Sequence, residues 1–486
     1  MSSDKDKLKK SALSGVIWKF MERVSAQLVA LVVQVVLARI LVPEDYAVVG
    51  IVSIFFAVCN VLISGGLNTA LIQKKDADTE DYSTVLHVSI ILAAILYVVM
   101  FFSAPVIANL YSNELLIPIF RVMSVTFFFH AFTSVLSAYA SSNLMFRKVF
   151  YSTMSGTAVS AVVGITMAMN GFGAWALVVQ QMTNAFCNAV VLYVTTKLKI
   201  VFRISFSRLK QLFGYGSKVF IASIISVIYD QLNPLIIGLK FTSTDLSFYT
   251  KGQSFPGLLN SSINDTLSAV LFPVISKVQD SKDDVLNVTR RYIKVASYII
   301  FPMMIGMLSV ADAFVSVILT DKWLPAVPYI QIFSFSYMFN IIQTGNLQAI
   351  KAIGRSDILL LLEVLKKSVY FAVIALFVFF SDSPVMLAVS GIVCTLVATL
   401  INTYPNRKLI GYRYRQQVVD LLPNFLLAVA MGSAVILVGQ LEMSRFLLLF
   451  AQIVVGVVVY VLLSVLTKNE NFFYLIDYIK MFLNRK

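Results

Sequence analysis

The stretch VFYSTMSGTAVSAVVGITMAMNGFGAWALVVQQMTNAFCNAVVLYVTT, residues 149–196, contains no charged side chain. It is long enough for two membrane-spanning helices, because about 20 apolar residues cross a bilayer core. Asn170-Gly171-Phe172-Gly173 interrupts it, and this combination of asparagine with glycine is typical of a tight turn. We therefore predict an antiparallel pair of transmembrane helices over 149–169 and 174–196.

The rest of the chain has the same character. Of its 486 residues, 58% are hydrophobic and 13% are charged, whereas a soluble domain carries about 25% charged residues. Backbone groups in hydrocarbon need hydrogen-bond partners within their own segment, so each apolar run is expected to be a helix. We predict an all-α integral membrane protein with about fourteen transmembrane helices. The predicted spans are 15–41, 46–72, 82–110, 116–141, 149–169, 174–196, 213–239, 246–276, 292–319, 326–350, 358–380, 384–405, 418–439 and 445–467.

The distribution of basic residues predicts the topology. The chain has 39 Lys and Arg against 25 Asp and Glu, a formal charge of +14. With the N-terminus in the cytoplasm, the inner loops and the two ends hold 28 basic residues, whereas the outer loops hold Lys240, Lys322 and Arg445. This bias obeys the positive-inside rule. We therefore predict that both termini are cytoplasmic, and we attribute the excess charge to topology rather than to nucleic-acid binding.

Four segments lie outside the spans or extend them. The Lys-rich start, 1–14, runs into an apolar stretch without a small-residue cleavage site, so we interpret it as a retained cytoplasmic end. Basic and apolar side chains mix in 197–212, which predicts an amphipathic linker on the cytoplasmic membrane surface. A basic cytoplasmic loop, 406–417, precedes helices thirteen and fourteen in 418–467. The tail, 468–486, is expected to be cytoplasmic and amphipathic.

Spans one to six and seven to twelve look like two copies of one unit. A shift of 199 residues, which becomes 200 after the next loop, superposes residues of the same kind. The superposed pairs are Leu13 and Leu212, Gly15 and Gly214, Lys19 and Lys218, Gln34 and Asn233, Asp45 and Asp245, Phe55 and Phe255, Leu67 and Leu267, and Leu71 and Leu271. We predict two six-helix bundles, 15–196 and 213–405, related by a parallel pseudo-twofold axis along the membrane normal. Substrate sites of such transporters lie between the repeats.

The residues that catalysis or metal binding would require are not grouped in this sequence. It has no Gly-rich phosphate loop, metal-spaced cluster or nucleophile elbow. His87 and His130 stand alone in separate apolar spans, and the three cysteines lie within apolar stretches. A membrane polymerase or glycosyltransferase would need a large extramembrane loop, and every predicted outer loop is short. We predict that the protein is not an enzyme and has no cofactor.

Three stretches resemble a known family. They are ILVPEDY at 40–46, AVLFPVISKVQDSKDD at 269–284 and DKWLPAVPYIQIFSFSY at 321–337. They are similar to the bacterial polysaccharide transporters, or Wzx-type flippases, nearest the colanic-acid-exporter branch. The superfamily also includes the multidrug-extruding MATE transporters and the lipid II flippase. Ala47 and Asp321 depart from the pattern, since both stand where glycine is expected.

The resemblance implies a MATE-like fold and a flippase in the bacterial inner membrane. Its cargo would be an undecaprenyl-pyrophosphate-linked oligosaccharide, such as an O-antigen, capsule or exopolysaccharide repeat unit. Transport would proceed by alternating access through a cationic central cavity. Lipid-linked oligosaccharide and membrane lipids are the implied partners, with a repeat-unit polymerase and glycosyltransferases of the same pathway.

Two polar stripes predict where a phosphate would bind. In span one, Lys19, Arg23, Gln27 and Gln34 fall within a sector of about 80° at about 100° per residue. In span seven the corresponding stripe is Lys218, Ser226, Tyr229 and Asn233. A lipid pyrophosphate needs opposite charge and N–H donors inside the membrane. We therefore hypothesise that the headgroup site consists of Lys19, Arg23, Lys218 and Lys251, and that the remaining stripe residues line the cavity.

A plainer interpretation stays open for the same cations. If span one begins at Val24, Lys19 and Arg23 are residues of the cytoplasmic edge whose stems snorkel to the interface. Lys218 is open to the same interpretation.

Two acidic residues suggest coupling to a proton or Na⁺ gradient. Asp230 precedes Asn233 and Pro234, and a proline at 234 cannot donate to the carbonyl of residue 230. Asp265 lies within span eight. A structural role as a counterion to Lys218 or Lys251 is the alternative for Asp230.

Two other transport functions fit the same fold. A cation-coupled MATE-type drug exporter predicts an acidic first bundle, but the only acid in its spans is Glu22, against Lys19, Arg23, Arg39 and Arg121. This balance favours an anionic substrate. Composition does not separate the lipid-linked oligosaccharide flippase from a lipid II flippase.

Overall fold

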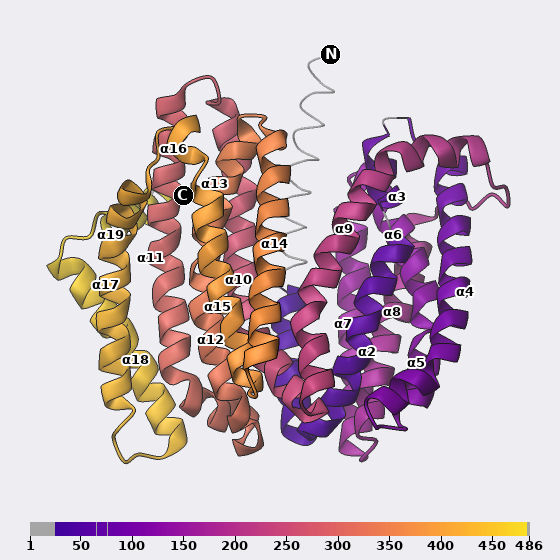
Figure 1. The fold of residues 1–486 in the computed structure, drawn as a ribbon, viewed down its shortest axis with the longest axis horizontal. Helices are drawn as coiled ribbons and strands as arrows, with labels where there is room; N and C mark the ends of the chain where they lie inside the picture. Colours follow the sequence, from indigo (N-terminus) through magenta and orange to yellow (C-terminus); the bar gives the residue numbers. More distant parts are fainter. Residues whose placement is uncertain (1–24, 65, 75, 484–486) are drawn as a thin grey trace. The chain divides into compact units, whose positions relative to one another are not determined.

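A computed structural model describes residues 25–64, 66–74 and 76–483, and these residues form helices and the turns between them, without a strand. Ten of the described helices are long and apolar enough to cross a membrane (Figure 1). The prediction of an all-α, multi-pass membrane protein is confirmed. The elements are α2 (Pro43–Ser64), α3 (Leu67–Gln73), α4 (Thr79–Leu110), α5 (Leu116–Met123), α6 (Thr126–Ser142), α7 (Phe146–Met169), α8 (Ala174–Thr196), α9 (Phe206–Lys240), α10 (Ser243–Lys277), α11 (Lys282–Phe314), the π-helix η1 (Val315–Leu319), the 3₁₀-helix η2 (Asp321–Ala326), α12 (Val327–Met338), α13 (Asn340–Ala352), α14 (Ser356–Phe380), α15 (Pro384–Thr403), α16 (Asn406–Leu409), α17 (Tyr414–Val438), α18 (Arg445–Leu466) and α19 (Glu470–Leu483).

The charge-free stretch 149–196 forms the helical pair that its sequence predicts, α7 and α8, which pack along each other. The turn between them needs its glycines. Gly171 and Gly173 have φ angles of 77° and 53°, a region that costs other residues about 1–2 kcal/mol. A Cβ at Gly173 would also lie 2.8 Å from Asp45 Oδ1. Glycine at both positions therefore lets the backbone close the turn, without the strain of a positive φ and without a Cβ that contacts Asp45.

Four of the fourteen predicted spans are not among the ten described helices that are long and apolar enough to cross a membrane. The first is described only as a shorter helix, Ser25–Ile40. The others are α10, the pair α12 and α13, and α14. Phe339 separates α12 from α13, and α14 bears Glu363, Lys366 and Lys367 among its apolar residues. The break at Phe339 leaves α12 and α13 short, and charged residues interrupt α14, so the total of fourteen spans stays a prediction.

The order of helices recurs along the chain. Ser25–Ile40, α2 with α3, α4, α5 with α6, α7 and α8 are followed by α9, α10, α11, α12 with α13, α14 and α15. The corner after the first helix of each series also has the same geometry. The Val42 amide donates to Asp45 Oδ2 over 3.1 Å, and the Thr242 amide donates to Asp245 Oδ2 over 3.1 Å. These paired corners agree with the internal repeat, whereas the axis relating the two copies stays a prediction.

The chain divides into two compact units, Met1–Ser247 and Phe248–Lys486. The division falls inside α10, later than the predicted linker at 197–212. The reason is that α9 packs against α2, α3 and α4. Gly66 and Gly216 allow the close approach, since a Cβ on Gly66 would lie 2.0 Å from the Gly216 carbonyl oxygen. The predicted bundles, 15–196 and 213–405, follow the internal repeat rather than the compact units, and they stay a prediction.

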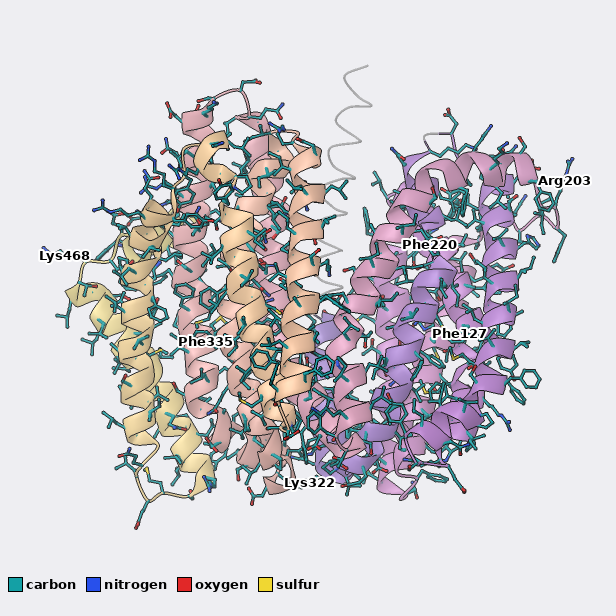
Figure 2. The ribbon with its side chains drawn as sticks, viewed as in Figure 1. Phe127, Arg203, Phe220, Lys322, Phe335 and Lys468 are labelled. Carbon is teal, nitrogen blue, oxygen red and sulfur yellow. The ribbon has the colours of Figure 1, made fainter. Side chains whose placement is uncertain are left out.

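Each unit has its own apolar interior and an apolar exterior. In the first unit, Phe56 packs against Phe120 and Phe127, which are fully buried (Figure 2). On the outside, Phe102 of α4 and Phe379 of α14 are 73% and 83% exposed. Large apolar side chains on the outside of a helical unit are stable in contact with lipid rather than water.

Candidate functional site

The predicted headgroup cations fall in different parts of the structure. Lys19 and Arg23 lie outside the described residues. Lys218 belongs to α9 and Asp265 to α10, but the side chains of both lie outside the description. Lys251, on α10 in the second unit, is the predicted cation whose surroundings the structure describes.

The Lys251 side chain is buried, with a relative exposure of 4%. Its ammonium lies 5.2 Å from the centroid of the Trp323 ring, and Phe248 packs against that ring edge-on. A cation over an indole face is attracted by the ring quadrupole, by about 2 kcal/mol when the pair is desolvated. Lys251 is therefore held inside its unit by an aromatic partner, and it does not snorkel to a surface.

The predicted cavity-lining residues of the described helices are all half-buried: Gln27, Gln34, Ser226, Tyr229 and Asn233. Asn233 Oδ1 is buried and has no hydrogen-bond partner among the residues that the structure describes. Asp230, one helical turn earlier, is exposed on the same helix. The helix α9 runs through Pro234 without ending, and since proline has no N–H, it cannot donate to the Asp230 carbonyl.

Buried asparagines that were not predicted from the sequence lie on neighbouring helices. Asn60 of α2 and Asn68 of α3 have buried amide oxygens without a hydrogen-bond partner in the described part of the chain, and both helices pack against α9. In the second unit, Asn260 and Asn264 of α10 have the same property. Buried polar atoms without partners are rare in folded proteins, and each invites an explanation.

A sequence signal for these asparagines existed. Asn60 and Asn260 superpose under the same shift of 200 that pairs Asp45 with Asp245. An amide at matching positions of two apolar spans is a stronger indicator of a polar lining than either residue alone, because asparagine is costly in hydrocarbon.

An ionic cluster fastens the first turn of α9 to the start of α4 within the first unit. Arg208 Nη1 lies 2.6 Å from Asp78 Oδ1 and 3.2 Å from Asp81 Oδ1, and Arg208 Nη2 lies 3.0 Å from Glu80 Oε2. Lys74 Nζ contacts the Asp81 carboxylate at 2.6 Å. The Arg208 guanidinium lowers the pKa of Asp78 by donating to its carboxylate. In return, the hydrogen bond to Asp78 raises the pKa of Arg208.

Backbone contacts extend this attachment. The Val201 amide donates to Ser83 Oγ over 2.9 Å, and the Ser205 amide donates to Thr84 Oγ1 over 3.3 Å. Residues 197–205 of the predicted linker thus form a non-helical segment bound to α4, whereas residues 206–212 are the first turns of α9. Its contact with a membrane surface stays a prediction.

Within the described part of the chain, no group of three His, Cys, Asp or Glu side chains gathers to hold a metal ion. The side chains predicted to line the cavity carry amides and hydroxyls, and Lys251 carries a cation. Such groups can bind sugar hydroxyls and phosphate oxygens through hydrogen bonds and charge.

Comparisons with known proteins agree with this geometry. The chain is 23% identical over 309 residues to the teichuronic acid biosynthesis protein TuaB of Bacillus subtilis (strain 168), a match that covers 61% of this chain and 62% of the relative's length. It is 22% identical over 452 residues to the lipopolysaccharide biosynthesis protein WzxC of Escherichia coli (strain K12), covering 89% and 90%.

Among solved structures, the lipid II flippase MurJ in an inward closed conformation superposes with a TM-score of 0.77 at 13% identity. This superposition covers 94% of this chain and 99% of the other. It shows that the two chains share a fold, as the resemblance in the sequence implied. Residues 36–328 match the family described as "Polysaccharide biosynthesis protein", and the chain therefore belongs to that family.

Proposed function

We propose that this protein is a flippase for an undecaprenyl-pyrophosphate-linked oligosaccharide repeat unit, destined for an O-antigen, capsule or exopolysaccharide. The observation that carries the proposal is the family match over 36–328. The names of TuaB and WzxC both refer to the biosynthesis of envelope polymers, and the fold is that of a multi-pass membrane protein. Transport occurs across the bacterial inner membrane by alternating access, with both termini in the cytoplasm.

The buried Lys251 supports an anionic cargo. Burying an ammonium inside a membrane protein is energetically costly. Charged residues within membrane spans commonly mark substrate or ion pathways. The pyrophosphate binds to the cations Lys19, Arg23, Lys218 and Lys251, whose N–H groups contact its oxygens. The attraction between these charges is stronger in a partly dry cavity than in water. The polyprenyl tail is as apolar as the lipid chains and stays among them during transport.

The sugars need a different lining. Each sugar hydroxyl both donates and accepts hydrogen bonds, so an uncharged polar wall binds it without fixing an ion. Gln27, Gln34, Ser226, Tyr229 and Asn233 provide this wall, and Asn60 and Asn260 add amide groups whose oxygens still lack donors.

The driving force is proposed to be a proton or Na⁺ gradient that acts through Asp230 or Asp265. Asp230 lies beside the position where Pro234 removes a backbone donor. Collapse of each gradient with a selective ionophore should slow transport in proteoliposomes. Unchanged rates after both treatments would remove the coupling from the proposal.

A transport assay tests the site directly. Proteoliposomes that contain the protein should move a fluorescent lipid-linked oligosaccharide between leaflets. Lys251→Gln should reduce the rate at least tenfold, because about 1.4 kcal/mol of lost attraction corresponds to a factor of ten. Lys408→Gln, an exposed lysine of α16, is the matched control. The double variant Lys19→Ala with Lys218→Ala should abolish transport, and full activity in both variants would overturn the cation site.

The lipid II flippase is the second candidate, which the superposition on MurJ favours. The same proteoliposomes should be given lipid II and an amphipathic cationic drug in separate arms. Movement of lipid II alone would replace the oligosaccharide proposal, and export of the drug alone would support the MATE-type alternative. The phenotype of deleting the gene for this protein should also be compared with the phenotypes of deleting the polymerase and the glycosyltransferases of the pathway, which we propose as functional partners.

A further inference from the structure

A cavity of about 640 Å³ lies within the second unit, between α11, α17, α18 and α19. This volume is in the range of sites that bind small molecules. Apolar side chains of α17 and α18 form one side, including Val419, Leu426 and Leu463. Asp420 of α17 and the charged groups of α11 and of the corner between α18 and α19 form an ionic side, because ion pairs join Asp420 to Arg290 and Lys294, and Lys294 to Glu470. The cavity therefore suits a ligand with one apolar and one ionic part.

Several charges at the ionic side are engaged by the protein itself. Arg290 donates to both oxygens of the Asp420 carboxylate, at 2.8 and 2.7 Å. Lys294 Nζ lies 3.4 Å from Asp420 Oδ1 and 3.9 Å from Glu470 Oε2. These contacts neutralise Asp420, but they leave Lys294 and Glu470 able to bind further groups.

Two charges at the entrance are more open. The Glu470 side chain is 78% exposed, and its described ion pair is the long one with Lys294. Lys468 is exposed and forms no ion pair with the described residues; Figure 2 shows it at the outer edge of its unit. Asn471 also lines the cavity, and its buried Oδ1 has no hydrogen-bond partner within residues 25–64, 66–74 and 76–483. The entrance thus offers a cation, an anion and a spare amide oxygen.

The apolar side of the cavity continues onto the lipid-facing surface. Val419 and Leu426 line the cavity, and they are 59% and 57% exposed. Leu466, at the end of α18, is 71% exposed. A ligand whose head occupied the ionic side could therefore leave its chains in the surrounding lipid.

We propose that this cavity binds the head group of phosphatidylethanolamine, a phospholipid with a phosphate and a primary ammonium. The phosphate contacts Lys294 and Lys468. The ammonium donates to the Glu470 carboxylate and to the amide oxygen of Asn471. Basic pockets between membrane helices are known to bind lipid head groups, and the carboxylates here favour a zwitterion over a purely anionic head. A pyrophosphate would place its negative charges beside Asp420 and Glu470 and is disfavoured for the same reason.

Native mass spectrometry of the full-length protein in detergent tests the proposal. Phosphatidylethanolamine, phosphatidylglycerol and phosphatidylcholine with identical acyl chains are added in turn. Phosphatidylethanolamine should be retained best, because the quaternary ammonium of phosphatidylcholine has no N–H and phosphatidylglycerol has no cation. Glu470→Gln should weaken binding of phosphatidylethanolamine roughly tenfold, the factor that about 1.4 kcal/mol represents, and should spare the other two lipids. Lys468→Gln should weaken all three.

The matched controls are Glu442→Gln and Lys408→Gln, exposed residues that do not line the cavity. A second readout is the melting temperature, which phosphatidylethanolamine should raise in the wild type and in both controls. Equal retention of the three lipids, a preference for phosphatidylglycerol, or an unaltered preference in Glu470→Gln would each overturn the proposal. The inference goes beyond the proposed transport function, and loss of flipping with this lipid preference intact would count against that function alone.

Discussion

The guanidinium of Arg290 on α11 holds the carboxylate of Asp420 on α17 through two hydrogen bonds, 2.8 Å from Nε and 2.7 Å from Nη2. The Asp420 side chain is 2% exposed, whereas that of Arg290 is 34% exposed. The hydroxyl of Tyr412 also donates to Asp420 over 2.8 Å. The carboxylate is thus the buried partner of this pair, and it depends on its donors.

This asymmetry predicts unequal effects of substitution. Arg290→Met leaves a buried carboxylate with fewer donors and should destabilise the protein by about 2–3 kcal/mol. Asp420→Asn leaves an arginine that reaches solvent, and it should cost less. Thermal unfolding in detergent measures both. Arg355→Met, which breaks an exposed pair with Asp357, is the control and should change stability by about 0–1 kcal/mol. An equal loss in all three variants would contradict the argument.

The cluster around Arg208 should hold residues 201–205 on α4 over a wide pH range. Asp78 has a folded pKa below its unfolded value, since Arg208 donates to it. Its stabilising contribution is therefore present above the unfolded pKa and is lost as the pH falls through the folded pKa. Because the unfolded value is about 3.9, hydrogen exchange at the Val201 and Ser205 amides, corrected for intrinsic rates, should stay slow at neutral pH.

Arg208→Met tests the same cluster at neutral pH. Exchange at the two amides should become faster, while exchange in the α7–α8 pair should not change. Arg203→Met is the matched control, because Arg203 makes only a 3.9 Å contact with Glu80 and is 77% exposed. If the amides of 201–205 stay protected in Arg208→Met, the backbone contacts to Ser83 and Thr84 are sufficient without the ions.

Replacement of the buried asparagines should lower the transport rate without lowering the stability of the protein. Asn60→Leu or Asn260→Leu removes an amide whose oxygen has no hydrogen-bond partner among the described residues. The melting temperature should stay level or rise, because such an atom costs about 1–3 kcal/mol when buried. The transport rate should fall if these amides bind sugar. Asn143→Ala, at an exposed helix end, should alter neither quantity, and a fall in melting temperature for the leucine variants would assign the asparagines a structural role.

Substitutions at two glycines distinguish the effect of a steric clash from the effect of backbone strain. Gly66→Ala should prevent α9 from packing on α3, because its Cβ would lie 2.0 Å from the Gly216 carbonyl oxygen. Gly171 has a φ of 77°, similar to the 63° of Gly66, but no atom of the described residues lies within 4 Å of its Cβ position. Gly171→Ala should cost only the backbone term of about 1–2 kcal/mol. Folded yield and melting temperature should be lowered far more by Gly66→Ala than by Gly171→Ala.

The fold was predictable because composition and length decide it. The runs of apolar residues around Asn170-Gly171-Phe172-Gly173 define two helices whatever lies beside them, and the α7–α8 boundaries match within a few residues. The breaks inside α5–α6 and α12–α13 were not predicted, since Ser124 and Phe339 are ordinary residues in apolar segments. Those breaks depend on packing between helices rather than on local preference.

The site was less predictable, because hydropathy does not say which neighbour a side chain meets. Lys251 was singled out from the sequence as an intramembrane charge, and the structure shows its side chain to be buried. Its partner Trp323 lies far along the sequence, and no periodicity connects them. Likewise, the carboxylate of Asp420 lay at the start of a predicted span with nothing to indicate Arg290. Asn60 and Asn260 could have been found, because the repeat aligns them.

Asn424 of α17 has a consequence for how the protein is assembled. It is fully buried, and its amide nitrogen donates to the Lys294 carbonyl and to Ser297 Oγ at 2.9 and 2.8 Å. Its amide oxygen accepts from Asn469 and Asn471 at 3.2 and 3.3 Å. These last two donors are 45 and 47 residues further along the chain. Until the corner between α18 and α19 has been synthesised, a newly made chain carries an unsatisfied acceptor next to α11, so products that are truncated or stalled before this corner should be marked for proteolysis by the incomplete seam itself.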